Sequence, residues 1–369
     1  MVARRPRSPI LGHITPNWFA AVMGTGIVAN AAATLRTQAP GQHTAALGVW
    51  LLASVLLVGL TVATGLHWLL YRDRAARHHH DPVMAHFYGA PPMALLTVGA
   101  GTLLLGKDLV GLSLAVRIDW VFWALGTALG LATAVVIPYL TFTRHQITAD
   151  SAFGGWLMPV VPPMVSAATG ALLLPHLPAG PARLTMLIAC YAMFGLSLLA
   201  SLVIIPLIWG RLARHGAGPA VLVPTLFIVL GPLGQSVTAA NLLGGNARLA
   251  VPAPYANALE VFGVVYGVPV MGFALLWGAM ATAITVRTMR TGLPFALTWW
   301  SFTFPVGTCV TGLTGLAVHT GSTALEGAAA AAYAGLLCAW LLVATRTVRG
   351  VSTGALLRPS VVRLGQPSR

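Results

Sequence analysis

The stretch ALGVWLLASVLLVGLTVATGLHWLLY (46–71) contains no Asp, Glu, Lys or Arg and is followed at once by Arg72, Arg74 and Arg77. An apolar helix needs about 20 residues to cross the hydrocarbon core of a bilayer. Arginines directly after such a run are typical of a membrane boundary. This segment is therefore predicted to be a transmembrane helix, and it sets the fold class of the chain.

The composition extends this interpretation to the whole sequence of 369 residues. Hydrophobic residues make up 57% and charged residues only 8%, whereas soluble domains carry roughly 25% charged residues. The net charge of +14 comes from cations in short gaps between apolar runs. Nucleic-acid binders instead gather their cations on a water-soluble face. Membrane lipid is thus the expected environment, and no nucleic-acid partner is expected.

Ten continuously apolar runs divide the chain. Alternating strands of a membrane barrel would not give such continuous runs, so we expect an all-α membrane protein with ten transmembrane helices. The expected organisation is a tail over 1–16, a transmembrane transporter or channel domain over 17–345 and a second tail over 346–369. The predicted spans are 17–35, 46–71, 87–106, 118–143, 153–175, 184–210, 218–243, 255–286, 295–318 and 327–345.

The cations are distributed unequally between the two sides that these spans define. The two tails and the gaps after even-numbered spans hold 16 Lys and Arg residues, and the gaps after odd-numbered spans hold five. Cytoplasmic loops carry an excess of Lys and Arg. Both termini are therefore predicted to be cytoplasmic. The arginine-rich composition, which we attribute to a GC-rich bacterial genome, places the protein in a bacterial inner membrane.

Glycine and proline interrupt the odd-numbered spans more than the even-numbered ones. Proline removes a helical hydrogen bond, and in hydrocarbon the freed carbonyls need protein or a water-filled cavity. We therefore expect five kinked odd helices around a central pore and five straighter helices outside them. The alternative is that these residues only permit close helix packing. The predicted pore-lining or helix-breaking residues are Gly24, Thr25, Gly26, Pro91, Pro92, Pro159, Pro162, Pro163, Gly231, Pro232, Pro305 and Gly307.

The charge pattern inside the spans indicates what such a path could conduct. No Lys, Arg, Asp or Glu lies in the middle of a predicted span. The lack of carboxylates argues against a cation pathway, and broken helices direct positive N-termini toward the path. The pattern favours small anions.

An aromatic residue at a kink could close this path. Phe304 directly precedes Pro305, and Phe302 lies two residues earlier. An apolar side chain in a narrow, dewetted path acts as a hydrophobic gate. Both phenylalanines are candidates for a pore gate, and ordinary packing is the alternative.

Four segments resemble one known family: HITPNWFAAVMGTGIVANAA (13–32), DPVMAHFYGAPPMAL (81–95), GPLGQS (231–236) and WWSFTFPVGT (299–308). On these segments the chain is similar to the tellurite-resistance/dicarboxylate transporter family. That family, part of the voltage-dependent anion channel superfamily, includes yeast malate permeases, sulfite exporters and the slow-type anion channels of plants.

The resemblance implies a homotrimer with one pore per subunit. Each pore would be surrounded by five helical hairpins with the odd helices inside. It also implies a gating phenylalanine on the ninth helix, which favours Phe304 over Phe302.

For the substrate, the resemblance implies a small anion such as malate or succinate. The alternatives are a sulfite or tellurite-related oxyanion exporter and a halide- or nitrate-permeable channel. No catalytic set, metal-ligand spacing or cofactor motif is evident, so an enzyme is not expected and no metal or cofactor is assigned. A membrane-embedded enzyme depending on His86 or His145 is the alternative from another class.

Overall fold

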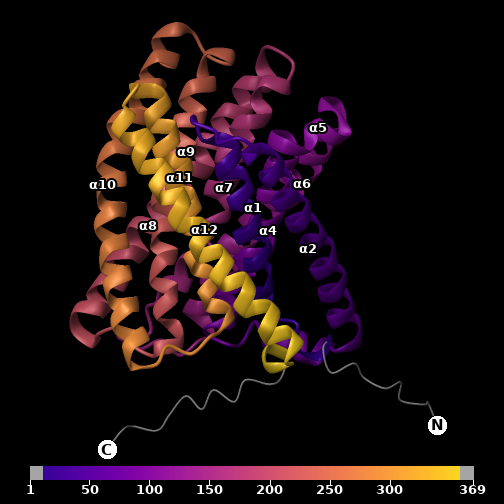
Figure 1. Cartoon of the computed structure of the whole chain (residues 1–369), viewed down its shortest axis with the longest axis vertical. Coiled ribbons are helices and arrows are strands. Elements are labelled where there is room, and N and C mark those ends of the chain that lie inside the picture. Colours follow the sequence, from indigo (N-terminus) through magenta and orange to yellow (C-terminus); the bar gives the residue numbers. More distant parts are fainter. Residues whose placement is uncertain (1–10, 358–369) are drawn as a thin grey trace, which may run out of the picture.

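The computed structural model describes residues 11–357, which form a bundle of long helices packed side by side (Figure 1). These residues contain no β-strand, and the all-α prediction is confirmed for them. The tail residues 1–10 and 358–369, with six of the arginines used to predict orientation, lie outside the described part. The α-helices are α1 (Phe19–Thr34), α2 (Gln42–Leu70), α3 (Arg72–Arg77), α4 (Ala90–Gly101), α5 (Lys107–Val110), α6 (Leu112–Thr143), α7 (Pro162–Leu173), α8 (Pro181–His215), α9 (Leu230–Asn246), α10 (Ala253–Thr291), α11 (Phe304–Thr320) and α12 (Thr323–Ser352).

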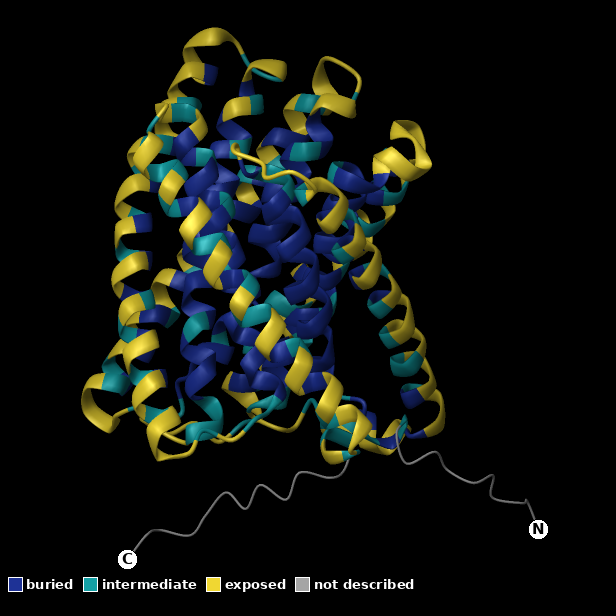
Figure 2. Ribbon diagram, in the orientation of Figure 1, coloured by how far each residue is buried: buried dark blue, intermediate teal, exposed yellow. Residues whose placement is uncertain are grey.

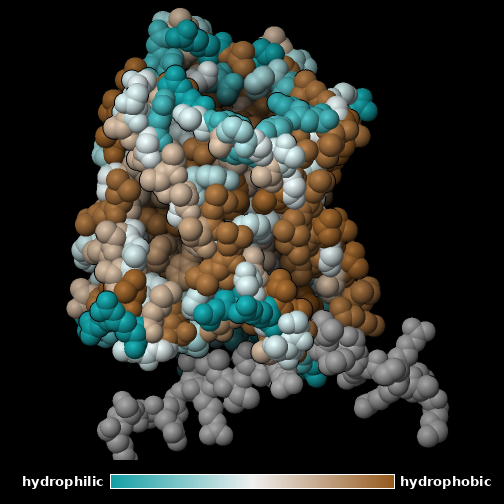
Figure 3. Space-filling view, in the orientation of Figure 1, coloured by the Kyte–Doolittle hydropathy of each residue, from teal (hydrophilic) through white to brown (hydrophobic). Residues whose placement is uncertain are grey.

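Eight helical stretches in 11–357 are long and apolar enough to cross a membrane. Hydrophobic residues form a broad band around the visible face, with hydrophilic residues at both ends (Figure 3). The two other predicted spans, 17–35 and 153–175, contain α1 and α7, which are only 16 and 12 residues long. The protein is a multi-pass membrane protein, and ten crossings remain a prediction.

The helices fall into a buried and an exposed set (Figure 2). In α2, α6, α8, α10 and α12, between 17% and 33% of the most apolar window is buried, whereas the stretches containing α4, α9 and α11 are 67–78% buried. In α1, 14 of 16 residues are buried, and in α7, 11 of 12. An apolar helix that is exposed within the protein must face lipid or another subunit. Helices α1, α4, α7, α9 and α11 therefore form the interior.

Each inner helix is preceded by a segment of a different helix type. A 3-10 segment precedes each of α1, α4, α7, α9 and α11, and the α-helix follows it. Prolines occupy the first turn of α4, α7, α9 and α11, where a missing N–H costs no intrahelical bond. The 3-10 segments are η2 (Pro16–Trp18), η3 (Met84–Gly89), η5 (Gly154–Leu157), η7 (Ala220–Val229) and η9 (Leu297–Phe302).

The predicted helix breaks of α4, α7, α9 and α11 take the form of a change of helix type rather than a bend within a continuous α-helix. The prolines of the inner helices mark where a 3-10 segment gives way to an α-helix. Prolines within a continuous α-helix are found on the outer set, where Pro138, Pro206 and Pro269 lie inside α6, α8 and α10.

Both ends of the described chain lie at one end of the bundle, which we call the proximal end. Residues of η1 (Leu11–His13) and η10 (Ala355–Leu357) line a common cavity with the segments that follow α2, α8 and α10. The segment after α6 joins them through His145, whose Nε2 lies 3.0 Å from the His79 carbonyl oxygen. The opposite end is the distal end.

One acidic residue lies deeper within a helix than the sequence predicts. The predicted fourth span began at residue 118, but α6 begins at Leu112, directly after Gly111 with its positive φ of 80°. Asp119 therefore lies two turns inside the helix and is fully buried. Its carboxylate lies beside Gly99 of α4 and has no hydrogen-bond partner among residues 11–357.

Candidate anion pathway

A cavity of about 340 Å³ lies among the inner helices toward the distal end. Its lining comes from α1, α4 with the π-helical turn η4 (Thr102–Gly106), α7, α9 and α11, and none of its lining residues belongs to α2, α6, α8, α10 or α12. We call it the distal cavity. The buried helices thus enclose an internal space that the outer helices do not reach.

The distal cavity has a mostly apolar surface with amide and hydroxyl side chains set into it, and its described lining contains no Asp, Glu, Lys or Arg. Its lining hydroxyls largely donate to carbonyls of their own helices, as Thr97 does to Met93 and Thr314 to Val310. The Gln235 side chain is different, because it is 5% exposed and its amide makes no hydrogen bond with any other residue of 11–357. An amide in this position can donate to an anion in the cavity. The polar lining residues are Asn30, Thr34, Thr97, Thr169, Gln235, Thr238, Asn241, Thr311, Thr314 and His319.

A second cavity of about 600 Å³ opens at the proximal end. We call it the proximal cavity. Arg74, which follows α2, lines it together with His13, His78 and Asp81, and Asn17 contributes from η2. Burial is the main cause that lowers the pKa of His13, and it lowers the pKa of His78 to about 4. Both histidines are therefore neutral at pH 7, and Arg74 supplies the fixed positive charge.

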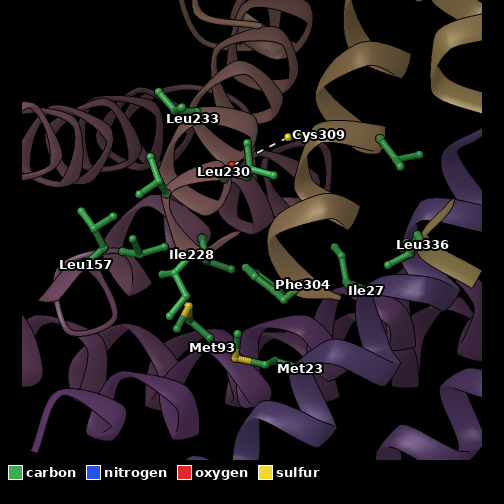
Figure 4. Close-up of a cluster of buried hydrophobic side chains, with 14 of the residues drawn as sticks. Met23, Ile27, Met93, Leu157, Ile228, Leu230, Leu233, Phe304, Cys309 and Leu336 are labelled. Carbon is green, nitrogen blue, oxygen red and sulfur yellow. Dashed lines mark hydrogen bonds between the residues drawn. The ribbon is translucent and has the colours of Figure 1, made fainter. Parts of the chain in front are cut away.

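A layer of apolar side chains lies between the two cavities. It consists of Met23, Ile27, Met93, Ile228 and Phe304, each 5% exposed or less. Figure 4 shows Phe304 in the middle of this region, between Ile27 and the two methionines. We call this group the apolar layer.

The chain passes the three levels in the same order on four inner helices. Along α1, Trp18 lines the proximal cavity, Met23 lies in the apolar layer and Asn30 lines the distal cavity. The same order is seen for Phe87, Met93 and Thr97, for Leu222, Ile228 and Gln235, and for Thr298, Phe304 and Thr311. The two cavities therefore lie along one axis, with the apolar layer between them.

The two predicted gate residues occupy different environments. Phe304 is the first residue of α11, is 2% exposed and lines the distal cavity. Phe302 lies in η9 and packs edge-on against Phe227, at 5.0 Å between ring centroids, and against Trp299, at 5.7 Å. Phe302 lines neither cavity. The geometry supports Phe304 rather than Phe302 as the gate candidate.

The predicted glycines of α1 and α11 lie at close contacts between inner helices. A Cβ on Gly24 would meet the Thr303 hydroxyl, and one on Gly307 would come within 2.4 Å of Ile27. A Cβ on Gly26 would lie 2.8 Å from Thr97. Small residues of this kind let helix backbones approach closely.

The other predicted residues also lie on the inner elements. Thr25 accepts a hydrogen bond from the Trp340 indole at 3.1 Å. Apart from Phe304, the predicted residues do not line the two cavities. Pro91, Pro92, Pro162, Pro163, Gly231, Pro232 and Pro305 belong to the first turns of their helices, and Pro159 lies in the turn before α7.

The polar residues of the distal cavity escaped the sequence analysis. Gln235 lies within the GPLGQS segment, where the predicted pore residues are Gly231 and Pro232. An uncharged polar side chain in the middle of an apolar span is the signal that could have identified Gln235, Asn30 and Asn241.

Comparison with known proteins agrees with this architecture. The family model for the voltage-dependent anion channel matches residues 13–348, which covers all five inner helices, the whole lining of the distal cavity and most of the lining of the proximal cavity. The chain belongs to the voltage-dependent anion channel family. This membership confirms the resemblance that the four motifs indicate.

Relatives in this family include transporters and exporters. The chain is 29% identical over 303 residues to an uncharacterized transporter of Methanocaldococcus jannaschii, covering 82% of this chain and 83% of that one. It is 27% identical over 354 residues to the sulfite efflux pump SSU1 of Trichophyton rubrum, covering 94% and 93%. A sulfite efflux pump SSU1 of Candida albicans is 24% identical over 319 residues, covering 81% and 65%. Family and cavities together identify the chain as an anion transporter of the membrane.

Proposed function

We propose that this protein exports sulfite, as a small oxyanion, along the axis that joins the proximal and distal cavities. The observation that carries the proposal is the distal cavity. It is enclosed by the five inner helices, has amide and hydroxyl groups within a mostly apolar lining, and contains no Asp, Glu, Lys or Arg in its described lining.

The chemistry of this lining favours a compact anion over a dicarboxylate. Recognition of carboxylate groups in proteins relies strongly on bidentate arginine pairs, and the distal cavity offers no arginine. Hydroxyl and amide groups around a small space suit an ion that keeps part of its hydration. The relatives named sulfite efflux pump SSU1 support the same substrate. Malate and succinate, which the sequence analysis placed first, remain predictions that the same assay tests.

The proposed topology is ten crossings arranged as five hairpins, each pairing a buried helix with the exposed helix that follows it. The proximal end would be cytoplasmic. Among residues 11–357, ten arginines lie toward this end, and five cations lie toward the distal end, as the positive-inside rule expects. A bacterial inner membrane is proposed on the arginine-rich composition, and a homotrimer with one pore per subunit is proposed on the family resemblance; native mass spectrometry of the detergent-solubilised protein tests the trimer.

In this arrangement the apolar layer is the gate. Phe304 fills the axis between the two cavities, and an apolar constriction resists a hydrated ion until the side chain moves.

The test is a flux assay with the full-length protein in proteoliposomes. Vesicles are loaded in parallel with sulfite, malate, succinate, nitrate or chloride, and efflux is followed with and without a pH gradient. We expect sulfite efflux well above that of protein-free vesicles, and malate and succinate efflux at least tenfold slower. Malate or succinate moving faster than sulfite would refute the substrate assignment, and no flux of any anion would refute the function.

A further inference from the structure

The proximal cavity contains an arginine that is not paired with any carboxylate of residues 11–357. The Arg74 guanidinium lies over the Tyr71 ring at 5.6 Å from its centroid, and Arg74 forms no ion pair with a carboxylate of residues 11–357. A guanidinium presents several N–H donors in a fixed planar fork that matches an oxyanion. Arg74 is therefore free to bind an anion that enters this cavity.

A second donor reaches the same cavity from a different element. Asn17 in η2 is 9% exposed, and its Oδ1 accepts a hydrogen bond from the Thr15 hydroxyl at 2.5 Å. This contact fixes the orientation of the amide. The Nδ2 group of Asn17 donates to no other residue of 11–357, so it remains available in the proximal cavity.

The negative charge in the cavity is engaged elsewhere. Asp81 Oδ1 accepts hydrogen bonds from the backbone N–H groups of Val83 and Met84, at 2.9 and 2.8 Å. This turn holds the carboxylate in place without an ion pair to Arg74. An anion would therefore bind on the side of the cavity with Arg74 and Asn17, away from Asp81.

Two arginines at the distal end are paired with carboxylates. Arg36 pairs with Glu326 at 2.7 Å, and Arg248 pairs with Glu260 at 3.3 Å. Lys107, Arg117 and Arg183 at that end form no ion pair among residues 11–357, but none of these five cations lines the distal cavity. The contrast between a free arginine in the lining of the proximal cavity and a distal cavity without a cation in its described lining favours capture at the proximal end and release at the distal end.

We propose that Arg74 and Asn17 form a capture site for the transported oxyanion in the proximal cavity, upstream of the apolar layer. The site rests on the proposed transport function and deepens it, because it names the residues that first bind the ion on the cytoplasmic side. It would raise the local anion concentration next to the path. Arg74 acts by direct hydrogen bonding and charge.

Helix α3 offers matched controls for this site. Arg72 and Arg77 lie on the same six-residue helix, are exposed and do not line the proximal cavity. Arg77 Nε donates to the Asp73 carbonyl at 3.1 Å. Replacing any of the three arginines by glutamine removes the same charge from the same end. Arg74 differs from the other two in lining the proximal cavity and in lying over the Tyr71 ring, and the sulfite dependence of the measurements separates anion binding from the loss of that ring contact.

The experiment measures the concentration dependence of sulfite flux from the proximal side in inside-out vesicles that contain full-length protein. For Arg74→Gln we expect KM to rise about tenfold with little change in the maximal rate, as expected for one lost charge-assisted hydrogen-bonded contact. Arg72→Gln and Arg77→Gln should stay within twofold of the wild type. An unchanged KM in Arg74→Gln, or an equal rise in all three variants, would overturn the site.

Two further measurements make the outcome decisive. Sulfite-induced thermal stabilisation of the purified protein should be present in the wild type and lost in Arg74→Gln. This binding result holds even if no flux is found, so failure of the site and failure of transport are distinguishable. Repeating the KM comparison in vesicles of phosphatidylcholine alone separates the transported ion from an anionic lipid headgroup. A difference that appears only when anionic lipid is present would assign Arg74 to lipid and refute the capture site.

Discussion

Truncating Phe304 to alanine should open the axis between the two cavities. The Phe304 ring is 2% exposed and lies within the apolar layer with Met23, Ile27 and Met93 (Figure 4). No side chain of the layer carries a charge or a hydrogen-bonding group that could replace the ring. Without the ring, water can enter from the distal cavity, and the barrier to a hydrated anion falls.

The expected effects of Phe304→Ala on flux and stability are large enough to measure. Removing a phenylalanine side chain vacates roughly 100 Å³, and at about 24 cal/mol per Å³ the cavity costs ~2.4 kcal/mol of stability. Hydration of the vacated space between the two cavities offsets part of this cost. A barrier reduction of only 1.4 kcal/mol would raise flux about tenfold. We therefore expect basal sulfite and chloride flux to rise at least tenfold, with a lower unfolding temperature.

The assay is passive efflux from proteoliposomes at equal protein density, with Phe302→Ala as the control. Phe302 packs against Phe227 and Trp299 and lines neither cavity. Its truncation should lower stability without raising flux. Unchanged basal flux in Phe304→Ala, or an equal rise in Phe302→Ala, would refute the assignment of Phe304 as the gate.

Three further changes test the packing, the charge and the binding chemistry. Gly234→Ala should destabilise by about 1–3 kcal/mol, seen as a lower unfolding temperature in detergent, because a Cβ there would lie 2.5 Å from the backbone nitrogen of Cys309; Gly272→Ala, with open space around it, should not. Burial and the neighbouring His67 lower the pKa of His78 from 6.5 to about 4, so below pH 6.5 the unfolded chain binds a proton that the folded protein does not. Stability should fall by about 1 kcal/mol between pH 7 and pH 5, after discounting for partial exposure, and His78→Gln should flatten this dependence in unfolding curves. Gln235→Leu should reduce sulfite flux roughly tenfold or more, because an amide donor facing the cavity is lost. The unfolding temperature should change by no more than about 2 °C, since no hydrogen bond among residues 11–357 is lost. Full flux in this variant would exclude Gln235 from the path.

The fold class and the division of the helices could be predicted from the sequence. Long apolar runs bounded by arginine indicate membrane helices whatever their packing, and the excess of Gly and Pro in alternate runs reflects the close contacts of the inner helices. The prediction located Phe304 because its position next to Pro305 is a local feature of the chain.

Other features depend on contacts between distant segments. The prolines suggested kinks, but whether Pro162 bends a helix or begins one depends on the hydrogen bonds of the turn before it. Asp119 appeared to lie at a membrane boundary, because the sequence did not show that α6 extends back to Leu112. The position of Gln235 in a cavity could not be predicted, because four other helices complete the lining around it. The sequence does not distinguish Arg74 from Arg72 and Arg77, because only the folded structure places Arg74 in the lining of the proximal cavity.

The central claim, that anions pass between the five inner helices, can be tested at Thr311. This residue lines the distal cavity and is partly accessible. The background protein carries Cys338→Ser, because Cys338 is exposed and would react with a thiol reagent, whereas Cys190 and Cys309 are buried. Sulfite flux is measured in Thr311→Cys before and after modification with a membrane-impermeant, negatively charged thiosulfonate, in parallel with the background protein. We predict that modification blocks flux in Thr311→Cys and leaves the background unchanged. Full flux through a completely modified Thr311→Cys protein would contradict a path through the distal cavity.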